Sequence, residues 1–275
     1  MSKEHDRSAA DRPVRIDSHA HGDPTRYRGS AAAYVKRMRR EGIDAVLLIA
    51  EAEQCLRGVR RFGEFVIPVA WVMLDDLEKR DLRGEIERHL DRGCKGIKFI
   101  RPLYPYADER YWPLYDAVSR RGAVAVFHTG YLAFEGLEAR PIQFQHMRAA
   151  EIDAVARRFC DLKILMAHFS NPWWEEAWKV SWSRKNVYAD LSGGTAIRRS
   201  LAMWAETFAP NGRLMPDSVE KLCFGTDTRY FRPGPHGFQP YIDFYEALLE
   251  RIAAPPRLRR KVWAGTLKKL FGLKG

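Results

Sequence analysis

Four short apolar runs of this 275-residue chain each end in a side chain that can bind a metal ion or transfer a proton. His19 and His21 end the first run, His128 and His168 end two later runs, and Asp227 ends the last. Neutral imidazole and carboxylate groups are the ligands that Zn²⁺ and similar ions prefer. The pattern therefore predicts one divalent metal ion, with Zn²⁺ expected first and Mn²⁺, Fe²⁺ or Co²⁺ as alternatives.

The spacing within Asp17-Ser-His19-Ala-His21 has a geometric meaning if the segment is a strand. Side chains two positions apart on a strand point to the same face. We therefore expect Asp17, His19 and His21 to face one way, with the two imidazoles sharing one cation. Asp17 lies one step deeper, and we expect it to orient a ligand histidine.

The runs that carry these residues belong to a regular alternation of strand-like and helix-like segments. The predicted strands are 14–19, 43–50, 65–72, 96–100, 123–128, 163–168, 187–191 and 221–227. The predicted helices are 32–40, 82–91, 111–120, 148–159, 173–183, 196–208 and 242–252. Strands that alternate with helices form a parallel sheet, and eight such units close into a barrel.

A single (β/α)8 TIM barrel is the fold class that this order predicts, because catalytic residues of such barrels lie at the carboxyl ends of the strands. The competing doubly wound sheet lacks its glycine-rich dinucleotide motif after the first strand. No linker divides the chain. We expect a flexible N-terminal tail over residues 1–13 and one barrel domain over residues 14–275, with segment 232–238 forming a loop over the barrel mouth.

Six motifs resemble the amidohydrolase superfamily, most closely its amidohydrolase-related branch of metal-dependent hydrolases and decarboxylases. They extend over nearly the whole chain: IDSHAH (16–21), GIKFIRP (96–102), VFHTG (126–130), ILMAHFSNPWW (164–174), NVYADLSG (186–193) and FGTDT (224–228). The segment 262–272 also resembles the closing helix of the family, with Thr266 where asparagine is frequent.

The resemblance implies a role for each strand-end residue. His19, His21 and His128 would be metal ligands, and Asp227 would be a ligand that also accepts the proton of the attacking water. His168 would act as general acid or base beside the metal, which is its usual role in mononuclear members. The plainer interpretation, buried core histidines and a helix-capping aspartate, does not explain why all of these groups follow strands.

These groups support two reactions. A Zn²⁺-type ion lowers the pKa of its bound water to about 7, and the resulting hydroxide can attack the carbonyl of an amide, lactone or ester. The same site could release CO2 from an aromatic or unsaturated carboxylic acid. Hydrolysis of a small molecule is the first expectation, since the decarboxylases tend to carry extra insertions. A metal-free lactonase is a third alternative that the basic composition leaves open.

Several residues near other strand ends are candidates for supporting roles. Lys98 lies where binuclear amidohydrolases have a carboxylated lysine that bridges two metals, but an ion-paired lysine at the barrel rim is the favoured interpretation. Arg101, Tyr131 and Arg229 follow strands in loops where substrate specificity usually resides. An arginine in such a loop could hold a substrate carboxylate through two hydrogen bonds.

Composition restricts the partners. The net charge of +11 comes largely from helix-like clusters that we interpret as solvated faces, and no nucleic-acid-binding motif occurs. Metal-dependent nucleases with related barrels usually have a glutamate where this chain has Lys98. No apolar run reaches the roughly 20 residues of a membrane span. The four scattered cysteines and the polar N-terminus favour a cytoplasmic location, and a homodimer remains open because relatives are often dimers.

Overall fold

Nine parallel strands form one sheet at the centre of the computed structural model, which describes residues 12–132, 141–194, 197–232 and 236–273. The sheet order is β8-β7-β6-β5-β4-β3-β2-β1-β9, so neighbours in sequence are neighbours in space. The strands are β1 (Ile16–His21), β2 (Ala45–Ala50), β3 (Val66–Met73), β4 (Gly96–Ile100), β5 (Val124–His128), β6 (Lys163–Ala167), β7 (Val187–Asp190), β8 (Leu222–Cys223) and β9 (Thr228–Arg229).

The two outermost strands are pieces of one chain segment, and this segment closes the sheet. β8 pairs with β7 on one side, and β9 pairs with β1 on the other. Between them, the Ser18 amide donates to the Phe224 carbonyl at 2.8 Å, and the Asp227 amide donates to the His19 carbonyl at 2.7 Å. The predicted eighth strand therefore exists in two short parts, and the (β/α)8 TIM barrel is confirmed.

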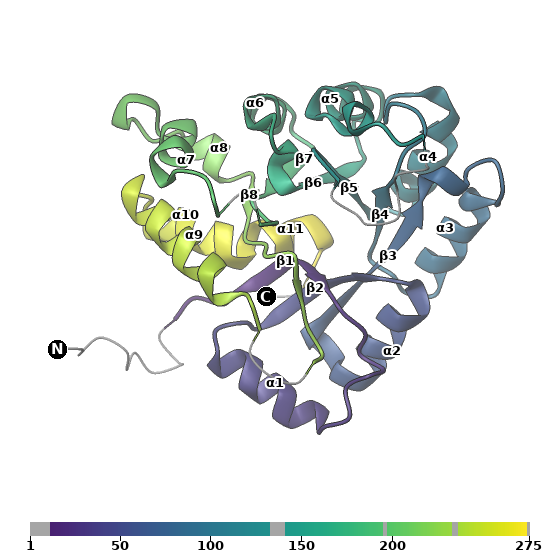
Figure 1. Ribbon diagram of the computed structural model, residues 1–275, viewed down its shortest axis with the longest axis horizontal. Coiled ribbons are helices and arrows are strands. Elements are labelled where there is room, and N and C mark those ends of the chain that lie inside the picture. The colour runs from purple at the N-terminus through teal and green to yellow at the C-terminus, as the bar shows by residue number, and fades with distance from the viewer. Residues whose placement is uncertain (1–11, 133–140, 195–196, 233–235, 274–275) are drawn as a thin grey trace.

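Helices follow the strands and lie on the outside of the sheet (Figure 1). The helices are α1 (Ala31–Arg40), α2 (Ala52–Phe62), α3 (Leu82–Asp91), α4 (Trp112–Arg120), α5 (Ala149–Arg158), α6 (Trp174–Ser183), α7 (Leu201–Phe208), α8 (Pro216–Val219), α9 (Gln239–Arg251), α10 (Pro256–Arg260) and α11 (Thr266–Phe271). The sequence prediction lacked α2, although Ala52, Cys55 and Leu56 line its buried face. Its many charged residues obscured this pattern. The predicted start of α7 at residue 196 lies outside the described residues.

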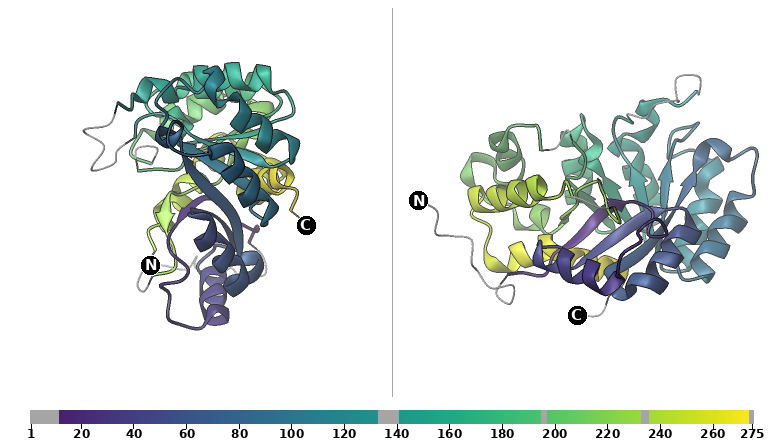
Figure 2. Two further views of the ribbon diagram at one scale, coloured as in Figure 1. Left: turned by 90° about the vertical axis from the view of Figure 1, so that its right-hand side faces the viewer. Right: turned by 60° about the horizontal axis from the view of Figure 1, so that its bottom comes forward.

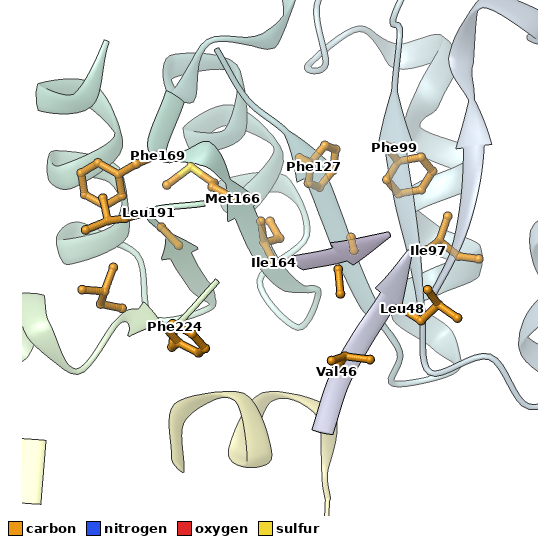
Figure 3. Close-up of a cluster of buried hydrophobic side chains, with 14 of the residues drawn as sticks. Val46, Leu48, Ile97, Phe99, Phe127, Ile164, Met166, Phe169, Leu191 and Phe224 are labelled. Carbon is orange, nitrogen blue, oxygen red and sulfur yellow. The ribbon is translucent and has the colours of Figure 1, made fainter. Parts of the chain in front are cut away.

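The strands separate two hydrophobic layers. On β2, Val46 and Leu48 point outward into the large cluster between strands and helices, part of which Figure 3 shows. Leu47 and Ile49 point inward into a smaller cluster that fills the barrel interior. This alternation explains why β2 reads as a continuous apolar run, because both faces of the strand are buried.

The C-terminal segment closes one end of the barrel interior. Leu267 and Leu270 of α11 belong to the same buried cluster as Ile16 of β1 and Leu47 of β2. The views in Figures 1 and 2 agree in placing the yellow α11 beside the purple β1. The segment 14–20 is thus packed against α11 at the closed end of the barrel, while the carboxyl ends of the strands remain available for chemistry.

The loop and tail predictions fall partly outside the described residues. Residues 1–11 and 233–235 are not described, and Arg12 forms an ion pair with Asp44 at 2.7 Å. His236 is buried, with Nε2 3.1 Å from the Tyr34 hydroxyl, so it packs in the loop rather than facing the strand ends. Among the described helices, none has both the length and the apolar character needed to span a membrane.

Candidate metal centre

The carboxyl ends of three chain segments bring donor atoms close together. In the described part of the chain, one nitrogen of His19, one of His168 and one carboxylate oxygen of Asp227 all lie within 4.8 Å of one another. They come from β1, from the short helix η5 (His168–Ser170) after β6, and from the bend between β8 and β9. The structure therefore brings these three predicted residues together.

His21 joins this group through Asp227. Its Nδ1 lies 2.8 Å from the Ile49 carbonyl oxygen, which can only accept, so Nδ1 carries the hydrogen. Its Nε2 lies 3.1 Å from Asp227 Oδ1, and His19 Nε2 lies 3.7 Å from the same oxygen. In the neutral His21 ring, Nε2 presents a lone pair to a carboxylate, and a cation between them satisfies both. This donor set fits a divalent metal ion.

His128 completes the row of imidazoles. Its ring centroid lies 4.7 Å from that of His168, and the His168 centroid lies 4.6 Å from that of His19. Burial lowers the pKa of His19 to about 3 and holds the pKa of His128 well below its usual value. A neutral ring keeps a lone pair that a metal ion could accept, so burial leaves these histidines in a form that can bind metal.

Asp227 carries the negative charge of the group. Burial by itself raises the pKa of a carboxyl group, but the neighbouring imidazoles of His21, His168 and His19 outweigh it and hold the Asp227 pKa well below its usual range. The side chain is 34% exposed, whereas that of His19 is 1% exposed. Asp227 therefore stands as a carboxylate at the boundary between the buried histidines and the open end of the barrel.

Unusual backbone conformations occur at the same place. His168 and Asp227 have φ values of 66° and 65°, and Arg101 has a φ of 61°. Left-handed conformations are uncommon for residues other than glycine and cluster at functional sites. Gly193 has a φ of 90°, and a Cβ atom there would lie 3.0 Å from His168 Nδ1. A side chain at position 193 would therefore crowd the His168 ring and strain the local backbone.

Asp17 does not face the imidazoles, contrary to the prediction. A register shift between Asp17 and Ala20 interrupts the alternation of β1. The carboxylate accepts hydrogen bonds from the Tyr230 hydroxyl at 2.8 Å and from the Thr226 amide and hydroxyl at 3.0 and 2.6 Å. Burial raises the Asp17 pKa to about 7 despite these bonds and one from the His19 amide. Asp17 fastens β1 to the last strand and touches no imidazole ring through these contacts.

Lys98 is buried inside the barrel rather than ion-paired at its rim. On β4 it lies between Trp71 of β3 and Val126 of β5, and Nζ has no hydrogen-bond partner within the described residues. Burial lowers the Lys98 pKa to about 7, although the nearby Asp190 and Asp227 raise it. Lys98 is therefore a buried lysine whose charged form is favoured by the carboxylates of Asp190 and Asp227.

The three loop candidates lie at the rim with different surroundings. The Arg101 guanidinium forms an ion pair with Asp75, so its charge is already matched. Tyr131 is 61% exposed, and its carbonyl oxygen lies 3.4 Å from His128 Nε2. Arg229 on β9 is exposed. Of these three residues, Tyr131 alone contacts a strand-end histidine in the described part of the chain, and it does so through its backbone carbonyl.

Asp190 at the end of β7 is the residue that the sequence prediction missed. It is fully buried and contacts Ser18, His19, His168 and Ser192. The signal was present, because β7 also ends in an acidic residue and lies within the NVYADLSG motif. Its neighbours on β1 and η5 are separated from it by 22 residues or more, so only the fold reveals the contacts.

The family follows from the match of the sequence to known families. The family model described as amidohydrolase matches residues 16–273, which is nearly the whole chain. This chain belongs to the amidohydrolase family. The matched range begins with the first residue of β1 and ends just after α11, so it includes all strands of the barrel.

Solved structures share this amidohydrolase fold at low sequence identity. The 5-carboxyvanillate decarboxylase of Sphingomonas paucimobilis has 12% identity and a TM-score of 0.63, covering 96% of this chain and 100% of that chain. A dihydroxybenzoic acid decarboxylase of Polaromonas sp. with bound manganese has 16% identity and a TM-score of 0.60, covering 95% and 98%. The dihydroorotase of Campylobacter jejuni has 15% identity and a TM-score of 0.59, covering 96% and 84%. A comparison with curated proteins gives no significant match.

Proposed function

We propose that this amidohydrolase-family protein is a metal-dependent hydrolase that acts on an amide, lactone or ester bond of a small molecule. The observation that carries the proposal is the convergence of His19, His21 and Asp227, with two imidazole Nε2 atoms at 3.1 and 3.7 Å from one carboxylate oxygen. His19, His21, His128 and Asp227 would hold one divalent ion. When bound, such an ion polarises a carbonyl group and lowers the pKa of water.

Two residues handle the protons in this proposal. Asp227 is a carboxylate at the open end of the group, so it can accept a proton from the attacking water. His168 stands between His19 and His128, and the pKa of its ring is lowered by burial, which keeps it neutral. In the next step the proton taken up by Asp227 passes to His168, whose ring nitrogen lies within 4.8 Å of an Asp227 oxygen, and from there to the leaving group, which leaves Asp227 ionised and His168 neutral as before.

Decarboxylation of an aromatic or unsaturated acid is the second candidate, and a specific observation favours it. The Tyr131 and Phe144 rings lie 5.7 Å apart by centroid, and Phe144 stacks on Trp173 at 5.5 Å. These aromatic side chains come from the segments that follow β5 and β6, the strands that carry His128 and precede His168, and could pack against a substrate ring. The two decarboxylases with the same fold add support to this reaction.

Metal content is the first experiment. Elemental mass spectrometry on protein purified without chelators or metal-affinity resin should give about one equivalent of Zn²⁺ or Mn²⁺ per chain, as expected for a single site. About two equivalents would instead support a carboxylated Lys98 that bridges two metals. No metal, even after metal is added back, would contradict the proposal and favour a metal-free lactonase.

Isotope labelling then separates the two reactions. Lactones, amides and aromatic carboxylic acids are offered to the metal-loaded protein in H₂¹⁸O and in D₂O. Hydrolysis places one ¹⁸O atom in the acid product and leaves the carbon skeleton intact. Decarboxylation releases CO2 and places one deuteron on the carbon that carried the carboxylate. A product with the deuteron and no ¹⁸O would overturn the hydrolase proposal in favour of the decarboxylase.

A further inference from the structure

Asp190 occupies a position that links two of the imidazoles of the metal centre. We propose that Asp190 is a positioning residue that places the ring hydrogens of His19 and His168 on Nδ1 and so presents both Nε2 atoms to the metal and the substrate. This inference rests on the proposed metal-dependent function, but its central claim concerns the protein without metal. No sequence motif or family match assigns this role to Asp190.

One carboxylate oxygen acts on His168 through a serine. Asp190 Oδ1 lies 2.5 Å from the Ser192 hydroxyl oxygen, and this oxygen lies 3.0 Å from His168 Nδ1. The carboxylate can only accept, so the single hydroxyl hydrogen of Ser192 points to Asp190. Ser192 Oγ therefore accepts from His168, and Nδ1 must carry the hydrogen. The Ser192 carbonyl oxygen, 3.3 Å from Nδ1, favours the same tautomer.

The same oxygen also holds the backbone of His168. The amides of His168 and Ser192 each donate to Asp190 Oδ1 at 3.0 Å. His168 has a φ of 66°, a conformation that is costly for a residue with a side chain. A hydrogen bond from this amide to a buried carboxylate stabilises the conformation, because charge-assisted bonds are roughly twice as strong as neutral ones.

The other carboxylate oxygen faces His19. Asp190 Oδ2 lies 3.6 Å from His19 Nδ1 and 3.1 Å from the Ser18 hydroxyl oxygen. His19 Nδ1 is buried and has no hydrogen-bond partner within the described residues, so Asp190 is its available acceptor. His19 Nε2 lies 3.7 Å from Asp227 Oδ1, on the side where the metal would lie, so a hydrogen on Nδ1 leaves the lone pair of Nε2 for that ion.

A merely structural role is the competing explanation, because Asp190 also ties β1, η5 and β7 together. The two explanations differ in one observable property, the tautomer of each ring. A structural tie alone makes no demand on which nitrogen is protonated. Asparagine at position 190 retains the shape and an accepting oxygen, but its amide can donate to a ring nitrogen and stabilise the other tautomer.

The test combines ring ¹⁵N chemical shifts of the metal-free protein with metal-binding titrations. Three variants are compared with the wild type: Asp190→Asn, Ser192→Ala and, as a matched control, Ser18→Ala. We expect Nδ1–H at His19 and His168 in the wild type. Asp190→Asn should move the hydrogen to Nε2 at His19 and weaken metal binding by about 10- to 100-fold. Ser192→Ala should raise the share of the Nε2–H tautomer at His168, because only the backbone carbonyl of residue 192 then accepts from Nδ1, and should leave the tautomer of His19 unchanged.

Ser18→Ala removes a hydrogen bond to Asp190 but no contact with an imidazole, so both tautomers should be retained. Unchanged tautomers and unchanged metal affinity in folded Asp190→Asn would overturn the inference, as would Nε2–H at both rings in the wild type. If Asp190→Asn does not fold, the ¹⁵N chemical shifts of His168 in Ser192→Ala still test whether Asp190 acts on His168 through Ser192. A wild-type protein that binds no metal would instead contradict the proposed function. The tautomers, which are measured without metal, would still test the positioning role of Asp190.

Discussion

The two ends of the barrel interior are built from the same strands but have opposite chemistry. At the closed end, Leu47 and Leu165 pack against Leu267 and Leu270 of α11. At the open end, one or two steps further along the strands, the inward positions carry imidazoles and carboxylates. Burying an aliphatic side chain contributes about 1.5–3 kcal/mol to stability, whereas burying an ionisable group without a partner costs free energy.

This contrast separates stability from chemistry within one barrel. The open end includes the strained backbone of His168 and Asp227 and the buried Nζ of Lys98, which has no hydrogen-bond partner among the residues that the structure describes. Such features are tolerated because the closed end and the outer layer hold the strands in place. We therefore expect substitutions at the open end to abolish function in a folded protein, and substitutions at the closed end to lower stability while leaving the metal centre intact.

The largest effect is expected from removing two ligands at the open end. The double variant His19→Ala/His21→Ala should lose its metal and reduce activity at least about 100-fold, because Asp227 keeps no imidazole from β1. Circular dichroism should show a folded barrel. Metal content is measured by elemental mass spectrometry beside the wild type, and full occupancy in the variant would show that the ligand assignment is wrong.

A cavity at the closed end should have the opposite outcome. Leu165 is fully buried in the inner cluster, so Leu165→Ala should lower the free energy of unfolding by about 2–5 kcal/mol in urea titrations. The metal content of the folded variant should equal that of the wild type. Leu165→Met is the matched control and should cost less than about 1.5 kcal/mol. Loss of metal from folded Leu165→Ala would contradict the proposal that the closed end contributes to stability and not to metal binding.

A third variant tests whether Asp17 belongs to the structural or the chemical part of the molecule. Tyr230→Phe removes the hydroxyl that donates to Asp17 Oδ2 at 2.8 Å, in a buried site. We expect the free energy of unfolding to fall by about 1–3 kcal/mol, because a buried acceptor loses one partner. Metal affinity should stay within a factor of about three, well below the effect of losing an orienting partner. A large loss of affinity with little loss of stability would place Asp17 in the metal centre after all.

The smallest effect concerns a charge near the closed end. Burial lowers the pKa of Lys221 to about 8, and its Nζ donates to the carbonyls of Arg184 and Lys185. The folded state releases this proton before the unfolded state does, so stability should rise as pH increases from about 8 to 10.5. Solvent screening keeps the rise small. Lys221→Met should flatten this part of the curve in thermal melts between pH 7.5 and 10.5, and an identical slope would refute the assignment.

Most of the fold and the candidate donor residues could be predicted from local sequence patterns. Continuous apolar runs such as residues 45–50 identify strands buried on both faces, and the placement of His128 and Asp227 at run ends follows from the sequence alone. The helix α2 was missed because its charged residues obscure a buried face that becomes evident when packed against β3. Strands and helices can be predicted from local patterns because the spacing of apolar residues reflects the backbone geometry of a single segment.

The contacts between side chains that are far apart in the sequence depend on the tertiary structure. One register shift in β1 turned Asp17 away from His19 and His21, and no periodicity rule reveals such a shift. Asp190 accepts a hydrogen bond from Ser18, 172 residues away in the sequence, and Lys98 lies inside the barrel with no hydrogen-bond partner for its Nζ in the described part of the chain. The closure of β8 and β9 onto opposite edges of the sheet brings these residues together. Their environment is a property of the closed barrel, since burial and hydrogen bonding depend on neighbours that the local sequence does not specify.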